Sequence, residues 1–309
     1  MSAMLILRSW MIVATTTVLY RMRRDNSPEG IANRPGTRYT ERMITESASG
    51  GLAGALRTWR TRRRVSQLEL AVRAGTTQRH VSFIESGRSM PGRAMIIRLA
   101  ESLEVPIRER NGLLLAAGFA PAYPQRELDD PQLAPVRAAL ERVLQGHLPY
   151  PAVIVDRHGD LISANAGFQM ITRGVDPHLL TPPVSVPRVL LHPCGLAPRI
   201  VNLDEWAWHI IDSVRAESVR NPSDRLQRLA EELVDLAPPR PRQLSPHHLG
   251  FAVPMHLRTS NPDSRELRLI TTLTHFGTAT DVTIAELRLE AFLPADEATS
   301  AALADLVRW

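Results

Sequence analysis

The chain has 309 residues, of which 44% are hydrophobic and 22% charged, a length and composition that predict about two soluble globular domains. A single cysteine, Cys194, excludes both a disulfide framework and a cysteine zinc site within one chain, and it fits a reducing cytoplasm. Residues 51–120 hold 12 arginines against 5 acidic residues, whereas residues 121–309 hold 18 against 23, so we expect nucleic acid to meet only the first part of the chain.

Residues 1–50 fit no standard targeting pattern. An apolar run over residues 5–20 is followed by three arginines, and residues 27–49 are rich in Gly, Pro, Ser and Arg. A membrane helix needs about 20 apolar residues, and a signal peptide places its basic residues before the apolar run. We interpret residues 1–50 as a disordered extension or a misassigned start, with a membrane tether as the alternative.

Residues 65–87 have the pattern of two short helices joined by a glycine turn. Ser66 precedes an apolar-periodic run and Glu69 follows three residues later, which predicts a capping box at the start of a helix. Gly75 is placed to end that helix, because glycine adopts positive φ without a Cβ clash. Thr76 or Thr77 can cap the helix that follows. This pattern of cap, glycine turn and second cap predicts a helix-turn-helix.

The second of these helices carries the residue types that read DNA. Val81 and Ile84 face inward, so the opposite face belongs to four polar residues: Thr77, Gln78, Arg79 and Ser82. Gln can make two hydrogen bonds to adenine, and Arg can make two to guanine. Thr or Ser can bind a base or a phosphate. The alternative is an ordinary helical hairpin with a solvated polar face. The segment closes with Glu85-Ser86-Gly87-Arg88.

Three further helices complete the predicted first domain. We expect them over residues 52–63, from Pro91 through Leu103, and from Pro106 to Gly118. Arg62 and Arg63 belong to a run of basic residues beside the predicted groove. We favour phosphate contact for this run over a merely solvated face.

Residues 65–87, the following Arg88-Ser89-Met90-Pro91 and the run Leu113-Leu114-Leu115-Ala116-Ala117-Gly118-Phe119-Ala120-Pro121 resemble the Xre family of helix-turn-helix regulators. The resemblance implies that Gln67 holds the DNA backbone. Phe83 departs from the polar residue often found at its position in the family. The predicted DNA-binding residues are Gln67, Thr76, Thr77, Gln78, Arg79, Ser82, Arg62, Arg63 and Arg88.

A Pro-rich, acidic linker and an amphipathic helix follow the DNA-binding domain. We assign residues 51–121 to the DNA-binding domain, residues 122–149 to the linker and this helix, and residues 150–309 to a second domain. The helix PVRAALERVLQG begins at Pro135 and places Val136, Leu140, Val143 and Leu144 on one side. Such a stripe is either core or the contact between two copies in a homodimer.

The second domain alternates strands and helices. We predict strands over residues 152–156, 160–165, 251–258, 266–275 and 283–292, with turns at residues 261–263 and at Gly277. Helices are expected after Asn202 and over residues 225–236. Two strands, then helices, then three strands predict a PAS-like antiparallel sheet that carries its helices on one face and encloses a pocket. The fold class is therefore multidomain: an α-helical bundle followed by an α+β domain.

Several motifs in this domain resemble the MmyB-like regulator ligand-binding domain. They are Pro151-Ala152-Val153-Ile154-Val155-Asp156 with Asn165, Leu190-Leu191-His192-Pro193, Pro198-Arg199-Ile200-Val201-Asn202, Thr274-His275-Phe276-Gly277-Thr278-Ala279 and Glu290-Ala291-Phe292-Leu293-Pro294-Ala295-Asp296. The resemblance implies a PAS-like fold, a fatty-acid-like ligand and control of bacterial genes.

We predict a ligand site that combines polar groups with an apolar channel. The polar candidates for a carboxylate head group are Asn165, His192, Arg199 and Arg258, and the apolar candidates for the channel are Phe168, Trp206, Ile210 and Phe276. Ordinary core packing is the alternative for the aromatic residues, and a surface ion pair is the alternative for Arg199.

We find no catalytic constellation and no metal-ligand spacing. His192, Cys194, Asp204 and His209 lie close in sequence, but without a spacing such as HExxH. We therefore expect a cytoplasmic one-component regulator that binds double-stranded DNA as a dimer and is not an enzyme. The alternatives are a C-terminal scaffold for dimerisation or protein binding, and an enzyme tethered to DNA.

Overall fold

The computed structural model describes residues 51–241, 253–259, 266–276 and 279–307. The predicted extension at residues 1–50 and the predicted turns at residues 261–263 and 277 lie outside these ranges.

Residues 51–116 form a bundle of helices, as the sequence predicts. The core of this bundle contains Leu56, Leu70, Val81 and Leu114, each at most 2% exposed, which are the positions that apolar periodicity assigns to the inner faces. Its helices are α2 (Gly51–Arg62), α3 (Gln67–Arg73), α4 (Gln78–Glu85), α5 (Arg93–Ser102) and α6 (Ile107–Ala116).

Local capping explains where the two central helices begin. Ser66 precedes α3 and its hydroxyl accepts a hydrogen bond from the Glu69 backbone N–H at 3.1 Å. The Glu69 carboxylate does not complete the predicted capping box, because it pairs with Arg73 instead. Gly75 has φ of +62° in the turn, and Thr77 caps α4 by accepting from the His80 N–H at 3.1 Å.

The C-terminal part is built on an antiparallel sheet with strand order β2-β1-β5-β4-β3, in agreement with the predicted PAS-like arrangement. Among the described residues its strands are β1 (Ala152–Val155), β2 (Leu161–Ala164), β3 (Met255–Leu257), β4 (Leu267–His275) and β5 (Arg288–Pro294).

The strand predicted over residues 283–292 begins later than expected. Residues Val282–Ala285 form a short helix, α12, because the Asp281 carboxylate accepts from the Thr283 N–H at 2.9 Å and caps it. The β-branched side chains of this segment favour a strand by propensity, and the cap outweighs that preference. β5 therefore starts at Arg288.

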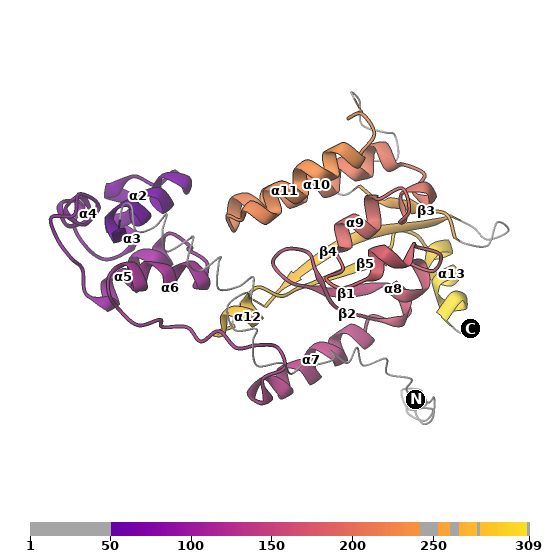
Figure 1. The fold of residues 1–309 in the computed structure, drawn as a ribbon, viewed down its shortest axis with the longest axis horizontal. Coiled ribbons are helices and arrows are strands. Elements are labelled where there is room, and N and C mark those ends of the chain that lie inside the picture. The colour runs from indigo at the N-terminus through magenta and orange to yellow at the C-terminus, as the bar shows by residue number, and fades with distance from the viewer. Residues whose placement is uncertain (1–50, 242–252, 260–265, 277–278, 308–309) are drawn as a thin grey trace, which may run out of the picture. The chain divides into compact units, whose positions relative to one another are not determined.

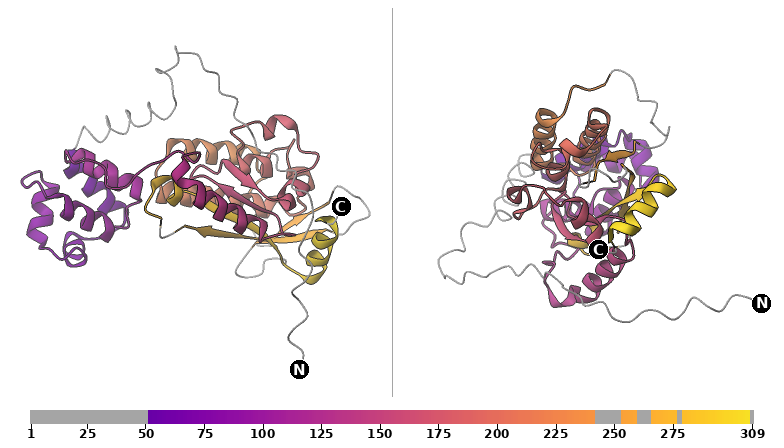
Figure 2. Two further views of the ribbon diagram at one scale, coloured as in Figure 1. Left: turned by 90° about the horizontal axis from the view of Figure 1, so that it is seen from below. Right: turned by 90° about the vertical axis from the view of Figure 1, so that its right-hand side faces the viewer.

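The remaining helices are α7 (Ala134–Gln145), α8 (Ala166–Ile171), α9 (Val186–Leu191), α10 (Leu203–Arg220), α11 (Asp224–Leu236) and α13 (Glu297–Val307). They cover both faces of the sheet rather than the one face predicted (Figures 1 and 2). Leu140 and Leu144 of α7 pack with Ile154 and Leu289 of the sheet, while α8 to α11 pack on the opposite face. Of the predicted apolar stripe on α7, only Val143 is exposed.

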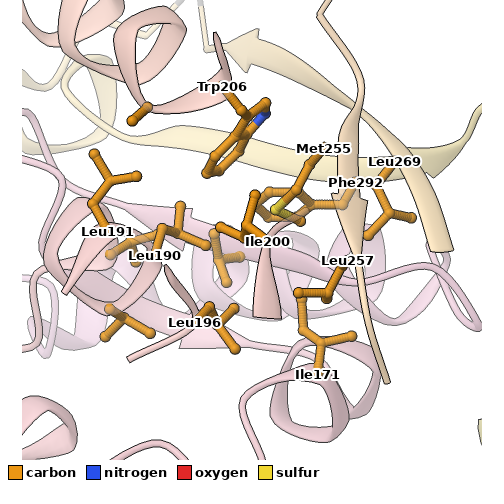
Figure 3. Close-up of a cluster of buried hydrophobic side chains, with 14 of the residues drawn as sticks. Ile171, Leu190, Leu191, Leu196, Ile200, Trp206, Met255, Leu257, Leu269 and Phe292 are labelled. Atoms are coloured by element: carbon orange, nitrogen blue, oxygen red, sulfur yellow. The ribbon is translucent and has the colours of Figure 1, made fainter. Parts of the chain in front are cut away.

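The larger core lies between the sheet and helices α8 to α11. Trp206 of α10 is completely buried there with Met255, Leu269 and Phe292 from the strands (Figure 3). This burial removes a tryptophan side chain of α10 from water and fixes the helix over the sheet.

Candidate nucleic-acid interface and ligand cavity

α4 presents a polar face to solvent. Val81 and Ile84 are at most 1% exposed, whereas Thr77, Gln78 and Arg79 are exposed at the N-terminal end of the same helix. The sequence predicts this division, because 3.6-residue periodicity turns these positions away from the core. The helix thus exposes at its start the side-chain types that recognition helices use to read bases, and the predicted roles of these three residues stay predictions.

Phe83 lies on α4 beside the predicted base-reading residues. The guanidinium carbon of Arg79 lies 5.2 Å from the centroid of the Phe83 ring, a cation–π contact one turn along the helix. Phe83 is half-buried and supports the flat side of the guanidinium. This contact gives the aromatic residue a partner at a position where the resemblance to the Xre family implies a polar one.

Glu85, at the end of α4, binds residues of two other helices: Arg60 of α2 and Gln67 at the start of α3. The Arg60 guanidinium donates two hydrogen bonds to the Glu85 carboxylate, at 2.7 Å and 3.0 Å, and the Gln67 amide donates a third at 2.8 Å. The Glu85 side chain is 3% exposed. Gln67 is therefore held at the first turn of α3, and its predicted contact with the DNA backbone stays a prediction.

The remaining predicted DNA-binding residues have different local roles. Arg63 donates to the carbonyl oxygens of Leu103 at 3.0 Å and Glu104 at 2.9 Å, at the end of α5. Arg62 is exposed and stacks on Trp59. Three more residues complete this set: Thr76, whose hydroxyl lies 2.9 Å from His80 Nδ1, the half-buried Ser82 of α4, and the exposed Arg88.

Two cavities open beside the sheet of the C-terminal part. One has a volume of about 210 Å³ and is lined by Phe276 and Arg157, with Ile107 from α6. The other has a volume of about 80 Å³ and is lined by Ile210 of α10 and Thr271 of β4. The residues that line both cavities are Glu217, His275 and Arg288.

Buried ion pairs connect the walls of these cavities. Nη1 of Arg288 lies 3.2 Å from Oε2 of Glu217. Both side chains are nearly buried: that of Arg288 is 12% exposed and that of Glu217 is 6% exposed. Glu286 accepts from Arg108 at 2.6 Å and 2.7 Å and from Arg157 at 3.0 Å. Strands, helix α10 and helix α6 thus meet through charged groups that water does not screen well.

Burial shifts the protonation of several cavity groups. It raises the pKa of Glu290, a tendency that the charge of Arg288 opposes. It lowers the pKa of His158 to about 4, assisted by the charge of Arg157, so this imidazole is neutral at pH 7. Burial alone would raise the pKa of Glu286, but hydrogen bonds from Arg108 and the charge of Arg157 outweigh it and hold this pKa below its ordinary value.

The polar residues predicted for a head group do not converge. Asn165 is buried and serves as a structural cap, accepting from Ala152 N and Phe168 N at 3.0 Å. Arg199 donates to the carbonyl oxygens of Arg258 at 3.0 Å and Ile171 at 2.8 Å. The Arg258 side chain is exposed, and His192 is half-exposed with its Nδ1 accepting from Cys194 N at 3.0 Å.

The apolar residues predicted for the channel divide between core and cavity. Phe168 and Trp206 are core residues, and the Phe168 ring lies 6.2 Å from that of Phe292. Ile210 lines the smaller cavity and Phe276 the larger one. The ligand roles of all eight residues remain predictions.

Sequence reasoning missed the charged residues that line the cavities, among them Arg157, Glu217, Arg288 and Glu290. A signal for two of them exists in the sequence, because Arg288 and Glu290 stand two apart in a predicted strand and so share one face. Val153 and Val155, their partners on β1, belong to the core cluster that the sheet forms with α8 to α11, so Arg288 and Glu290 lie on that face of the sheet.

Within the described ranges, no three His, Cys, Asp or Glu side chains gather as metal ligands do. Among the same residues, no helix combines the length and apolarity needed to cross a membrane.

Comparison with protein families assigns both parts of the chain. A helix-turn-helix family matches residues 56–110, and the MmyB-like transcription regulator ligand binding domain matches residues 136–306, more than half of the chain. The chain belongs to the family with this MmyB-like ligand binding domain. It is a DNA-binding transcription regulator, and the Xre-type helix-turn-helix predicted from the sequence is confirmed.

Other comparisons add little to the description of this MmyB-like regulator. No curated protein matches the chain. Among solved structures it is similar to an RNA-binding light-oxygen-voltage receptor, with 14% identity and a TM-score of 0.27 over 89% of this chain and 67% of that chain. A superposition this loose carries no argument.

Proposed function

We propose that this regulator is a one-component switch that binds a specific double-stranded DNA sequence and changes its DNA affinity when a small, largely apolar ligand occupies the C-terminal domain. The observation that carries the first half is the exposed face of α4, where Thr77, Gln78 and Arg79 stand clear of the buried Val81 and Ile84. Its place of action would be the cytoplasm, at the nucleoid, because its target is DNA.

The proposed ligand is amphipathic and fatty-acid-like. Apolar side chains line both cavities, among them Leu190, Ile210 and Phe276, and charged groups stand between them. Ligand control requires that the ligand bind the DNA-competent and DNA-incompetent states with different affinity. Direct contact supports such a difference, because Arg108 of α6 pairs with Glu286 on the cavity wall.

The protein would act as a homodimer. A dimer holds two recognition helices about one DNA turn apart and reads a two-fold symmetric site. Sedimentation of the purified protein, alone and with its operator, tests this expectation; a monomer on both samples would contradict it.

Fluorescence anisotropy tests DNA reading by comparing the affinity of each variant for two DNAs: the site that the unmodified protein selects from random sequences, here called the selected site, and a scrambled version of it. Arg79→Ala should weaken binding to the selected site by roughly tenfold or more and leave scrambled DNA nearly unchanged, since a bidentate base contact discriminates by about 1–3 kcal/mol. Arg62→Ala should weaken both DNAs about equally. Identical behaviour of the two variants would contradict the assignment of α4 as the recognition helix.

A scaffold is the second candidate function of the C-terminal domain. The observation that favours it is cavity size: about 210 Å³ and about 80 Å³ are below the roughly 300–1,000 Å³ of most small-molecule sites. Native mass spectrometry distinguishes the candidates, because a co-purified amphiphile supports ligand control and its absence under all growth conditions supports the scaffold.

A further inference from the structure

The segment that connects the DNA-binding bundle to the C-terminal domain is hydrogen-bonded on both sides. On the bundle side, the Asn111 side chain of α6 donates to the Tyr123 carbonyl oxygen at 2.7 Å. Its amide oxygen accepts from the backbone N–H groups of Ala122 at 2.9 Å and Tyr123 at 3.1 Å. The composition of this segment predicts a linker, but its first residues are fixed to α6.

The linker residues that follow are bound to α12. The Pro124 carbonyl oxygen accepts from the Val282 N–H at 2.9 Å. The Arg126 carbonyl oxygen accepts from the Thr283 hydroxyl at 2.6 Å. The Arg126 guanidinium also pairs with Asp281 at 3.0 Å, and the Asp281 side chain is only 8% exposed. Two backbone carbonyl oxygens and one ion pair therefore hold the linker on a single turn of helix.

α12 is itself anchored in the C-terminal domain. Ile284 of this helix and Leu287 just after it are buried in the same core cluster as Ile154 of β1. Asp281 uses one carboxylate oxygen to cap α12 and the other to pair with Arg126. A four-residue helix is not stable alone, so the cap and the core contacts that form α12 also prepare the surface that the linker binds.

A forked ion pair from α6 completes this junction. Arg108 donates to Glu286, directly after α12, at 2.6 Å and 2.7 Å, and the same guanidinium donates to Gln125 of the linker at 3.0 Å. We call these contacts the clasp: linker residues 124–126, Asp281 with α12, and the pair between Arg108 and Glu286. The clasp joins the last helix of the bundle, the linker and the C-terminal domain.

The clasp changes what the linker can do. A flexible linker of about 12 residues has a root-mean-square length of roughly 20 Å, so the domains that it joins vary widely in distance and orientation. In the clasp, the same freedom requires several hydrogen bonds and ion pairs to open together. Many of their groups are half-buried or buried, and opening leaves them unpaired, which disfavours the open state.

We infer that the clasp sets the spacing between the two DNA half-sites that the regulator recognises. This inference rests on the proposed homodimer, with the two copies in contact through their C-terminal domains. Each bundle then has a fixed position relative to the two-fold axis. One added base pair moves a half-site by about 3.4 Å along the DNA and rotates it by roughly 34°. A flexible linker absorbs this displacement, whereas the clasp resists it.

The test compares the DNA affinity of the full-length protein across half-site spacings. Fluorescence anisotropy gives the Kd for the selected site, for versions with two or five extra base pairs at its centre, and for a single half-site. The spacing ratio is the Kd for a lengthened site divided by that for the selected site, and it should be at least tenfold for the unmodified protein. Arg126→Gln/Thr283→Val should lower the ratio below threefold and leave the Kd for the single half-site unchanged.

The matched control is Arg188→Gln/Thr172→Val, which makes the same two chemical changes elsewhere in the C-terminal domain. Arg188 pairs with Glu232, and the Thr172 hydroxyl donates to the Phe168 carbonyl oxygen at 2.9 Å. This control should keep the spacing ratio of the unmodified protein.

Asp281→Asn tests the clasp by a second measurement. Asparagine still accepts the hydrogen bond that caps α12, but it no longer offers a charge to Arg126. Trypsin should therefore cleave the bond after Arg126 at least fivefold faster than in the unmodified protein, with the fragments identified by mass spectrometry. The spacing ratio of this variant should fall at least twofold. Thermal melting identifies any variant that fails to fold, and Asp281→Asn keeps the test decisive if the double variant is one of them.

The inference is overturned by a spacing ratio near one for the unmodified protein, by an unchanged ratio in the folded clasp variants, by an equal fall in the control, or by unchanged cleavage after Arg126. Its failure is distinguishable from failure of the homodimer by sedimentation on the selected site. A monomer there contradicts the homodimer and the spacing role together. A dimer whose ratio survives in the folded double variant contradicts the spacing role alone.

Discussion

Arg60 and Glu85 form a forked ion pair, with Nε–Oε1 and Nη2–Oε2 distances of 2.7 Å and 3.0 Å, between α2 and the end of α4, the proposed recognition helix. The Arg60 side chain is 15% exposed and that of Glu85 is 3% exposed. The pair therefore holds the end of α4 against α2, and with it the direction of the residues proposed to read bases.

Removal of one partner of this pair should destabilise the protein strongly. Glu85→Ala leaves Arg60 without its counter-ion and Gln67 without its acceptor, which should cost about 3 kcal/mol in the free energy of unfolding. Urea denaturation followed by circular dichroism measures this loss. The double variant Arg60→Met/Glu85→Leu should recover much of the stability, and a double variant as unstable as Glu85→Ala would contradict the explanation.

Phe83 should contribute to DNA selectivity through Arg79. Phe83→Leu removes the ring that supports the guanidinium, so Arg79 loses a preferred orientation while the helix keeps a hydrophobic residue. We expect a threefold to tenfold loss of affinity for the selected DNA site, at roughly 1 kcal/mol, and little change for scrambled DNA. Measured on an Arg79→Ala background, the Phe83→Leu effect should vanish; its persistence would show that Phe83 acts independently of Arg79.

Arg62 and Arg63 are neighbours with different expected phenotypes. Arg63 is used at the end of α5, where it donates to two carbonyl oxygens, so Arg63→Ala should lower the free energy of unfolding by about 1 kcal/mol. Arg62→Ala should instead reduce the slope of log affinity against log salt by about one phosphate contact. Salt titrations and thermal melts of both variants test the distinction, which fails if the two effects are exchanged.

The forked pair between Arg108 and Glu286 should carry the response to ligand. Glu286→Gln weakens the link between α6 and the segment that leads into β5, so the ratio of DNA affinities with and without decanoate, a fatty-acid probe, should shrink toward one. Glu232→Gln is the matched control, since it breaks a forked pair with Arg188 within the C-terminal domain. The explanation is wrong if both variants reduce the ratio equally.

His158 should make stability depend on pH. The unfolded chain binds a proton at this imidazole below pH 6.5, whereas the folded protein does so only near pH 4, so the folded state loses stability as pH falls from 6.5 to 4. The slope attributable to His158 should reach about 1.4 kcal/mol per pH unit. His158→Asn should remove this part of the slope. The difference between the two proteins isolates it from the raised carboxyl pKa values, which act in the opposite sense.

The features that could be predicted from residue order alone are local. Ser66, Gly75 and Thr77 act within four residues of the groups that they contact, so the start, turn and restart of the two central helices are predictable from the order of residue types. Periodicity then assigns Val81 and Ile84 to the core and the polar residues of α4 to solvent. The alternating segments of the second part predict its sheet for the same reason.

Which charged side chains meet depends on the packing of elements that are distant in the sequence. Arg108 and Glu286 are separated by 178 positions, and Glu217 and Arg288 come from a helix and a strand whose packing no local pattern encodes. The same limit explains Asn165: a polar residue beside a strand is compatible with a ligand site, but the three-dimensional structure places its amide against backbone groups of β1 and α8. Ion pairs in a low-dielectric interior depend on distance in space, and sequence periodicity reports only neighbours along one helix or strand.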